Sequence, residues 1–140
     1  MSMESVYLSG STGYIPGRVN VGLFQTKNGF WMVDSGIDDE AGRKIARFVE
    51  ELGVPLQRII TTHSHADHCG GNRFLKKRTG CSVAATKLEA IIIEETFLEP
   101  LLLWSAFPFA ELCNKFLQAK PSTIDKVIPN KGIIDESGLE

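Results

Sequence analysis

The sequence predicts an α/β fold in which helices cover a largely parallel sheet. An Asn-Gly pair separates two apolar runs near the N-terminus, which is the pattern of a β-hairpin. The chain then passes from a strand to an amphipathic helix and on to a β-branched strand, and such crossovers usually make parallel sheets. The length of 140 residues fits a single domain.

The first elements follow from local patterns. Strands are expected over 19–26 and 30–33, and the Asn-Gly turn between them predicts positive φ at both turn positions. A helix is expected over 39–52, because apolar residues recur there at spacings of three and four. Acidic residues at its start complement the helix dipole, and Gly53 supplies a left-handed stop.

The later elements continue the alternation. A β-branched run predicts a buried strand over 58–62. Four further elements are expected: a helix over 72–79 closed by Gly80, a strand over 81–84, a helix opened by a capping box at 86–89 and running through Leu98, and a strand over 126–128. Pro100 and Pro108 are expected to break the apolar stretch between the last two into helical pieces ending near Ala119. A turn at 129–132 leads into Ile133 and Ile134.

The three histidines of the chain all lie within six residues, directly after the strand at 58–62. Side chains two apart on an extended segment point the same way, so His63 and His65 can share one metal ion. Asp67 is next in that phase, and His68 follows at the turn into a helix, so these two can face a second cation. Zinc is the default for imidazole and carboxylate ligands, and iron or manganese also suits them. The strand before the cluster and the Gly-Gly pair after it argue against a merely adventitious metal binder.

Asp34 ends another predicted strand in the same way. Because ligand sites in open α/β sheets lie beyond the carboxyl ends of strands, its carboxylate could hydrogen-bond a liganding histidine or a bound water. The alternative is an Asx-turn in which Asp34 bonds its own backbone.

The run HSHADHCGGN resembles the HxHxDH signature of the metallo-β-lactamase superfamily, and VDSG resembles the D-[ST]-G turn that precedes it there. The resemblance implies an αββα sandwich, α/β or α+β by class, of which residues 1–140 would be the N-terminal half of one domain. It implies that His63 and His65 bind the first metal and that Asp67 and His68 bind the second. Asp67 would also position the nucleophilic water for hydrolysis of a small ester, thioester, lactone or lactam.

The resemblance also implies ligands that this sequence lacks. The family adds a downstream histidine to the first metal, an aspartate that bridges both metals and a last histidine to the second. No histidine follows His68, and neither Asp125 nor Asp135 has the glycine-flanked context of the bridging residue. We therefore expect a reading frame that continues past Glu140, and a 140-residue chain that is inactive alone and self-associates through an exposed sheet edge.

The composition bears on which binding partners and which cellular compartment are expected. The formal net charge of −2 gives no general attraction to nucleic acid or anionic membranes. Three cysteines without a CxxC pair favour a reducing, cytoplasmic setting. The N-terminus lacks a signal-peptide pattern, and the largely apolar window from Pro100 to Ala110, eleven residues long, is too short to span a bilayer. The partner that the resemblance implies is a small-molecule substrate.

Three features have competing interpretations. Cys69 could be a redox thiol or a metal ligand, and a small buried packing residue is the simpler interpretation. The basic run at 73–78 could grip phosphates, but cations at a helix C-terminus complement its dipole. The apolar segment over 97–109, with Trp104 and Phe107, could line a substrate pocket or pack in a core or dimer interface.

The function expected from the sequence is a zinc-dependent hydrolase with two metal ions, in which a metal-bound hydroxide attacks the carbonyl. Within the same fold, a phosphodiesterase or an iron-dependent redox protein is the alternative. From another class, the chain could be a catalytically incomplete half-domain that only binds metal or mediates oligomerisation.

Overall fold

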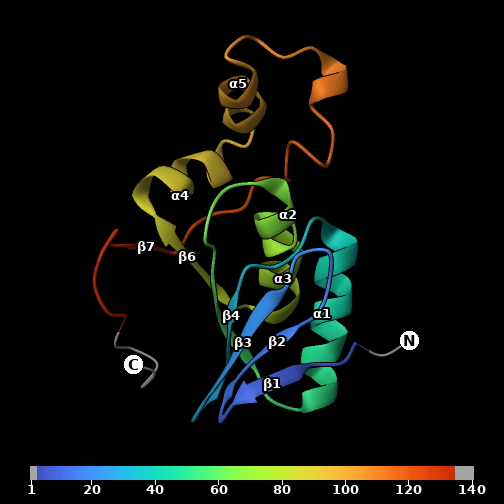
Figure 1. Cartoon of the computed structure of the whole chain (residues 1–140), viewed down its shortest axis with the longest axis vertical. Helices are drawn as coiled ribbons and strands as arrows, with labels where there is room; N and C mark the ends of the chain where they lie inside the picture. Colours follow the sequence, from blue (N-terminus) through green and yellow to red (C-terminus); the bar gives the residue numbers. More distant parts are fainter. Residues whose placement is uncertain (1–2, 135–140) are drawn as a thin grey trace.

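The computed structural model describes residues 3–134 as one seven-stranded sheet with helices against it (Figure 1). The strands lie in chain order across the sheet. They are β1 Val6–Ser9, β2 Thr12–Ile15, β3 Val21–Thr26, β4 Gly29–Val33, β5 Leu56–Ile60, β6 Ser82–Thr86 and β7 Lys126–Ile128. The helices are α1 Asp39–Leu52, α2 Ala66–Cys69, α3 Asn72–Thr79, α4 Lys87–Glu94 and α5 Leu98–Trp104, with a 3-10 turn at Ala110–Leu112.

The sheet changes direction at β4. Strands β1 to β4 pair antiparallel as a meander, and β4 to β7 pair parallel through helical crossovers. Helices α1 and α3 lie together on one side of the sheet (Figure 1). Their apolar side chains form one buried core with the sheet, in which Leu23, Met32, Ile59, Leu75 and Val83 are completely inaccessible. This confirms the predicted α/β class. The sheet is mixed and not largely parallel as predicted, because β1 to β4 form an antiparallel meander before the first helical crossover.

The other face of the sheet is only partly covered within residues 3–134. Val33 and Ile60 are half-buried there, and the guanidinium of Arg58 lies 4.8 Å from the ring centroid of Trp31. In an αββα sandwich a second sheet packs against this face.

The predicted hairpin forms, but its turn differs from the expectation. Neither Lys27 nor Asn28 has a positive φ, whereas Gly29 has φ 151° and already pairs with Thr26 across the hairpin. A Cβ at Gly29 would lie 2.2 Å from the carbonyl oxygen of Pro55. The glycine is therefore required by the close approach of the chain before β5 and not by the turn type.

Helix α1 has the predicted ends. The carboxylate of Asp38 accepts hydrogen bonds from the backbone N–H groups of Glu40 and Ala41, at 3.1 and 3.0 Å. Gly53 adopts the left-handed conformation with φ 69° and ends the helix. Gly80 ends α3 in the same way, with φ 74°.

Several predicted boundaries were wrong. Strands β1 and β2 were not predicted, because β1 is exposed along its whole length and carries no alternating pattern. Strand β5 begins and ends two residues earlier than expected, since Thr61 and Thr62 already belong to the loop that carries the histidines. Strand β6 continues to Thr86.

The helix expected from the capping box to Leu98 is two helices, with a break at 95–97. Neither half of the expected capping box forms: Thr86 makes no side-chain capping bond, and the Glu89 carboxylate accepts from the backbone N–H of Ser64 at 2.6 Å. Pro100 does not break a helix, since it lies in the first turn of α5, where its missing N–H has no helical partner to lose. Regular helical structure ends at Leu112, before the expected Ala119.

The last expectations concern residues 133–135 and membrane-spanning helices. Ile133 and Ile134 begin no regular element, and Asp135 lies outside the described residues. No helix within 3–134 is both long enough and apolar enough to cross a membrane.

The Asp38 cap gives a first test. Asp38→Ala should lower the free energy of unfolding by about 1 kcal/mol, and Asp38→Asn should lower it less, because asparagine caps equally well. The Lys115 ammonium lowers the pKa of Asp38 below its usual 3.8. The stability that the Asp38–Lys115 ion pair contributes is therefore present above pH 3.8 and is lost as the pH falls further. Neither variant can form this ion pair, so both should lack the contribution. Urea unfolding of the full-length protein at several pH values measures this; equal midpoints for all three proteins would contradict the cap.

Candidate metal centre

The candidate site lies where β4 and β5 end side by side. The parallel register pairs Val33 with Ile60, so Asp34 and Thr61 leave the sheet at the same edge. The backbone N–H of Asp34 donates to the carbonyl of Ile60 at 2.9 Å. Asp34 has φ 66°, an unusual conformation for a non-glycine residue that aspartate tolerates better than most.

The Asp34 carboxylate is buried and accepts three kinds of hydrogen bond. The backbone N–H of Thr62 donates to Oδ1 at 2.8 Å, and the Thr62 hydroxyl lies 2.9 Å from Oδ2. His68 Nδ1 lies 2.7 Å from Oδ2. The structure therefore places Asp34 against a histidine of the cluster, whereas an Asx-turn would have used its own backbone.

These bonds assign the protons on two imidazoles. Because the Thr62 hydroxyl donates to Asp34, it accepts from His63 Nδ1, which lies 2.9 Å away. His68 Nδ1 donates to Asp34 directly. The lone pair of each ring is then on Nε2, the nitrogen left to bind a metal ion.

His65 is anchored by a residue that the sequence analysis missed. Its Nε2 lies 3.1 Å from Oε1 of Glu99, whose side chain is only 12% exposed. The second oxygen of Glu99 lies 3.3 Å from the Ser64 hydroxyl. This assigns the proton of His65 to Nε2 and leaves its lone pair on Nδ1. Glu99 comes from α5, and its one sequence signal is a lone acid beside Pro100 in an apolar stretch.

The three imidazoles lie together. The ring centroid of His63 is 4.6 Å from that of His65 and 4.0 Å from that of His68. Burial lowers the pKa of His63, and the neighbouring His68 and His65 lower it further, which favours the neutral form that binds metals. Asp67 Oδ2 lies 3.8 Å from His68 Nε2.

Imidazole and carboxylate groups are ligands that suit zinc, but these side chains do not form a complete metal site by themselves. Within residues 3–134, no three His, Cys, Asp or Glu side chains are grouped so that they could hold a metal ion. His63 and His65 offer two nitrogens to one ion, and His68 with Asp67 offers a nitrogen and an oxygen beside it. Each pair has fewer than the roughly three protein ligands that a catalytic zinc requires.

The Gly-Gly pair after the histidines allows close packing. A Cβ at Gly70 would lie 1.9 Å from the carbonyl oxygen of Ile37, and one at Gly71 would lie 2.2 Å from that of Ser35. The backbone N–H of Ser35 donates to the His68 carbonyl at 2.9 Å. The turn after β4 thereby holds α2 and positions His68 beside Asp34.

Cys69 is a packing residue in this structure. It is 1% exposed, and its thiol donates to the Ser64 carbonyl at 3.3 Å. Burial raises its pKa to about 12, which disfavours the thiolate that redox chemistry uses.

The basic run at 73–78 has structural partners. Lys76 pairs with Asp125 at 2.7 Å, and Arg78 pairs with Glu50 at 2.9 Å. The last three basic residues lie in the final turn of α3, as the dipole interpretation predicted.

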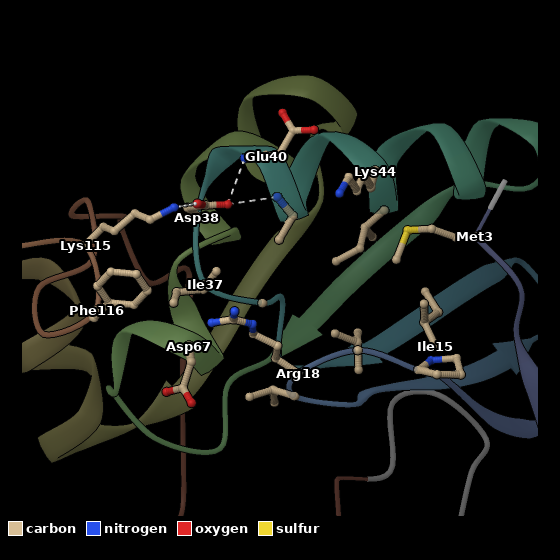
Figure 2. A pocket seen from close by; sticks show the side chains of 17 residues that line it. Met3, Ile15, Arg18, Ile37, Asp38, Glu40, Lys44, Asp67, Lys115 and Phe116 are labelled. Atoms are coloured by element: carbon tan, nitrogen blue, oxygen red, sulfur yellow. Dashed lines mark hydrogen bonds and ion pairs between the residues drawn. The ribbon is translucent and has the colours of Figure 1, made fainter. Parts of the chain in front are cut away.

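A cavity of about 860 Å³ opens beside Asp67 (Figure 2). Trp104 and Phe107, the residues expected to line a pocket, are not among those that line this one. Their side chains are 48% and 80% exposed, so neither lies in the core of this chain. The ring of Phe107 instead lies 5.3 Å from that of Phe97.

The fold and this edge of the sheet define a class of protein. The profile of the metallo-beta-lactamase superfamily matches residues 14–138, and the chain belongs to that superfamily. A type 2 metallo-beta-lactamase of Bacillus cereus is 31% identical over 103 residues, which are 70% of this chain and 40% of the relative. A hydroxyacylglutathione hydrolase of Pelagibacter ubique is 37% identical over 51 residues, 36% of this chain and 21% of the relative.

Solved structures share the fold. A metallo-beta-lactamase with a HARLDQ motif from Cronobacter sakazakii superposes with a TM-score of 0.73 at 21% identity, over 96% of this chain and 49% of that one. A subclass B3 metallo-beta-lactamase of Bradyrhizobium japonicum gives 0.71 at 20% identity, over 90% and 45%. The chain therefore spans about half the length, or less, of the proteins that it matches.

The contact between His65 and Glu99 leads to a prediction about metal affinity. Glu99→Ala should weaken zinc binding by the full-length protein by about tenfold or more, because the carboxylate orients the ring and makes it more basic. Glu99→Gln should retain part of the affinity through its amide oxygen. Competition with a chromophoric chelator measures the dissociation constants. Glu95→Ala, which removes an exposed carboxylate just before α5, is the control; equal loss in the control variant would argue against a specific role.

Proposed function

We propose that this chain supplies the metal-binding half of a zinc-dependent hydrolase that acts on a small ester, thioester, lactone or lactam. The observation that carries the proposal is the anchoring of all three imidazoles at the end of β5. Asp34, Thr62 and Glu99 each hold a ring nitrogen, so that Nε2, Nδ1 and Nε2 of the successive histidines remain for metal ions.

The residues have distinct roles in this proposal. His63 and His65 hold the first zinc, and His68 and Asp67 hold the second. Zinc bound there supplies a water acidified to a pKa near 7 and a Lewis acid for the substrate carbonyl. Asp67, whose side chain is 45% exposed and borders the cavity, orients the attacking water toward the substrate. Asp34 fixes His68 and, through Thr62, His63.

The printed names of the relatives support hydrolysis as the reaction class. Both named relatives are hydrolases, one of a hydroxyacylglutathione and one of a beta-lactam. The matched segment is less than half of each. For this chain, the choice among ester, thioester, lactone and lactam is part of the proposal.

The first test compares the proposed zinc ligand His65 with its sequence neighbour Ser64. In the full-length protein, His65→Ala should abolish tight zinc binding and hydrolysis, because it removes one of the roughly three protein ligands that a catalytic zinc requires. Ser64→Ala should retain most of both, since it removes only the 3.3 Å hydroxyl contact with Glu99. Metal analysis of the purified variants, together with thioester and lactone assays, measures the effect. Equal zinc loss in the two variants would exclude His65 as a ligand.

The ligand count gives a second test. The 140-residue chain alone, assayed with excess zinc against a thioester and a lactone, should show no turnover. Its histidines give the first metal two ligands where a catalytic zinc needs about three. Turnover at the rate of the full-length protein would show that residues 1–140 hold a complete site. Absence of turnover in the full-length protein as well would favour a metal-binding or oligomerisation module.

A further inference from the structure

The cavity beside Asp67 has the size and walls of a small-molecule site. It lies between the loop that joins β2 to β3 and the N-terminal half of α1 (Figure 2). Its volume of about 860 Å³ falls in the range of ligand pockets. Ile15, Val21 and Ile45 form apolar walls and are at most 3% exposed. A compact ligand with an apolar body therefore fits there.

Two cations face this cavity without a partner. Arg18 comes from the β2–β3 loop and Lys44 from α1. Within the described part of the chain, neither forms an ion pair or a hydrogen bond to a carboxylate. Two carboxylates of the wall do have cationic partners. Asp38 pairs with Lys115 at 2.7 Å, and Glu40 pairs with Arg43 of α1. Among the described residues, Arg18 and Lys44 are thus the cations of the wall that are left without an anionic partner.

The position of Arg18 relates this charge to the candidate metal centre. Figure 2 shows the Arg18 side chain reaching from the loop toward the part of the cavity where Ile37 and Asp67 lie. Asp67 is the remaining lining carboxylate and has no Lys or Arg partner among residues 3–134. A metal ion held there would neutralise its charge. A molecule in this cavity can therefore reach the guanidinium and the metal-binding edge together.

We propose that Arg18 binds a carboxylate carried by the substrate, so that the enzyme acts on small acyl compounds with a free carboxylate at the far end. The inference rests on the proposed hydrolase function and names its substrate class. The planar guanidinium of arginine matches a carboxylate in a bidentate manner, and Lys44 adds a second positive charge on the facing wall.

The same wall excludes a polyanion. Binding of a nucleic-acid backbone requires a series of unpaired cations, whereas this cavity has two. The cavity therefore suits a ligand that has an apolar body and a single negative charge.

The experiment compares two esters with the same leaving group in the zinc-loaded full-length protein. p-Nitrophenyl butyrate is neutral, and mono-p-nitrophenyl glutarate carries a carboxylate at the end of a similar chain. Arg18→Gln should lower kcat/KM for the glutarate ester by about tenfold or more, mainly through KM, and leave that for the butyrate ester within about twofold. Arg18→Lys should recover part of the loss. Arg47→Gln, an exposed arginine of α1 outside the cavity, should change neither.

Direct binding separates failure of this inference from failure of the proposed function. Glutarate titrated into the zinc-loaded protein should shift the backbone amide resonances of the 16–19 loop, and neutral glutaramide should not. Arg18→Gln should abolish the glutarate shifts. If both esters are hydrolysed equally well by the parent and by Arg18→Gln, the carboxylate site is wrong and hydrolysis stands. If neither ester is hydrolysed but glutarate still binds through Arg18, hydrolysis of these esters is wrong and the carboxylate site stands.

Discussion

The hydrogen bonds of the Asp34 carboxylate hold the candidate site together. A carboxylate that is only 4% exposed is costly to bury unless it is paired, and here three groups supply the pairing. They come from the backbone of the loop after β5, from the Thr62 side chain and from His68 on α2. One side chain after β4 therefore connects the ends of two parallel strands with the helix that follows, and it orients two imidazoles at once.

The parallel pairing of β4 with β5 makes this network possible. Parallel strands bring their carboxyl ends to the same edge of the sheet, so a short turn after one strand faces a short loop after the next. Gly70 and Gly71 then let α2 approach the turn after β4 more closely than any side chain would permit. The two glycines of the motif are therefore required for this packing.

The segment after α4 gains a role that its apolar composition does not suggest. Helix α5 brings Glu99 onto His65, while Trp104 near its end remains half exposed. The ion pairs of Lys115 with Asp38 and of Lys120 with Asp39 fasten the following loop to the start of α1. Phe116 then reaches the cavity wall. The surroundings of His65 and the wall of the cavity thus depend on chain segments far from the histidine motif in sequence.

The local patterns of the sequence were sufficient for some features. The apolar stripe and the acidic start predicted α1, Gly53 and Gly80 predicted the ends of α1 and α3, and the order of strand, helix and strand predicted the α/β class. The clustered histidines after a β-branched run predicted where the candidate site lies. These features depend on short-range periodicity and on the conformational freedom of glycine, both of which are visible in a single segment.

Long-range contacts decided the rest. Glu89 has the position of a capping-box acid, but it bonds to Ser64 instead, because the fold brings α4 against the histidine loop. Gly29 looks like a turn glycine, but it is needed where the chain before β5 passes close by. Glu99 lies 34 residues from His65, as their sequence numbers show, and no local pattern links them. The sequence by itself determined which histidines and which aspartate cluster at the end of β5. The tertiary structure decided which ring nitrogen each histidine offers, because that depends on partners that only folding brings within hydrogen-bond distance.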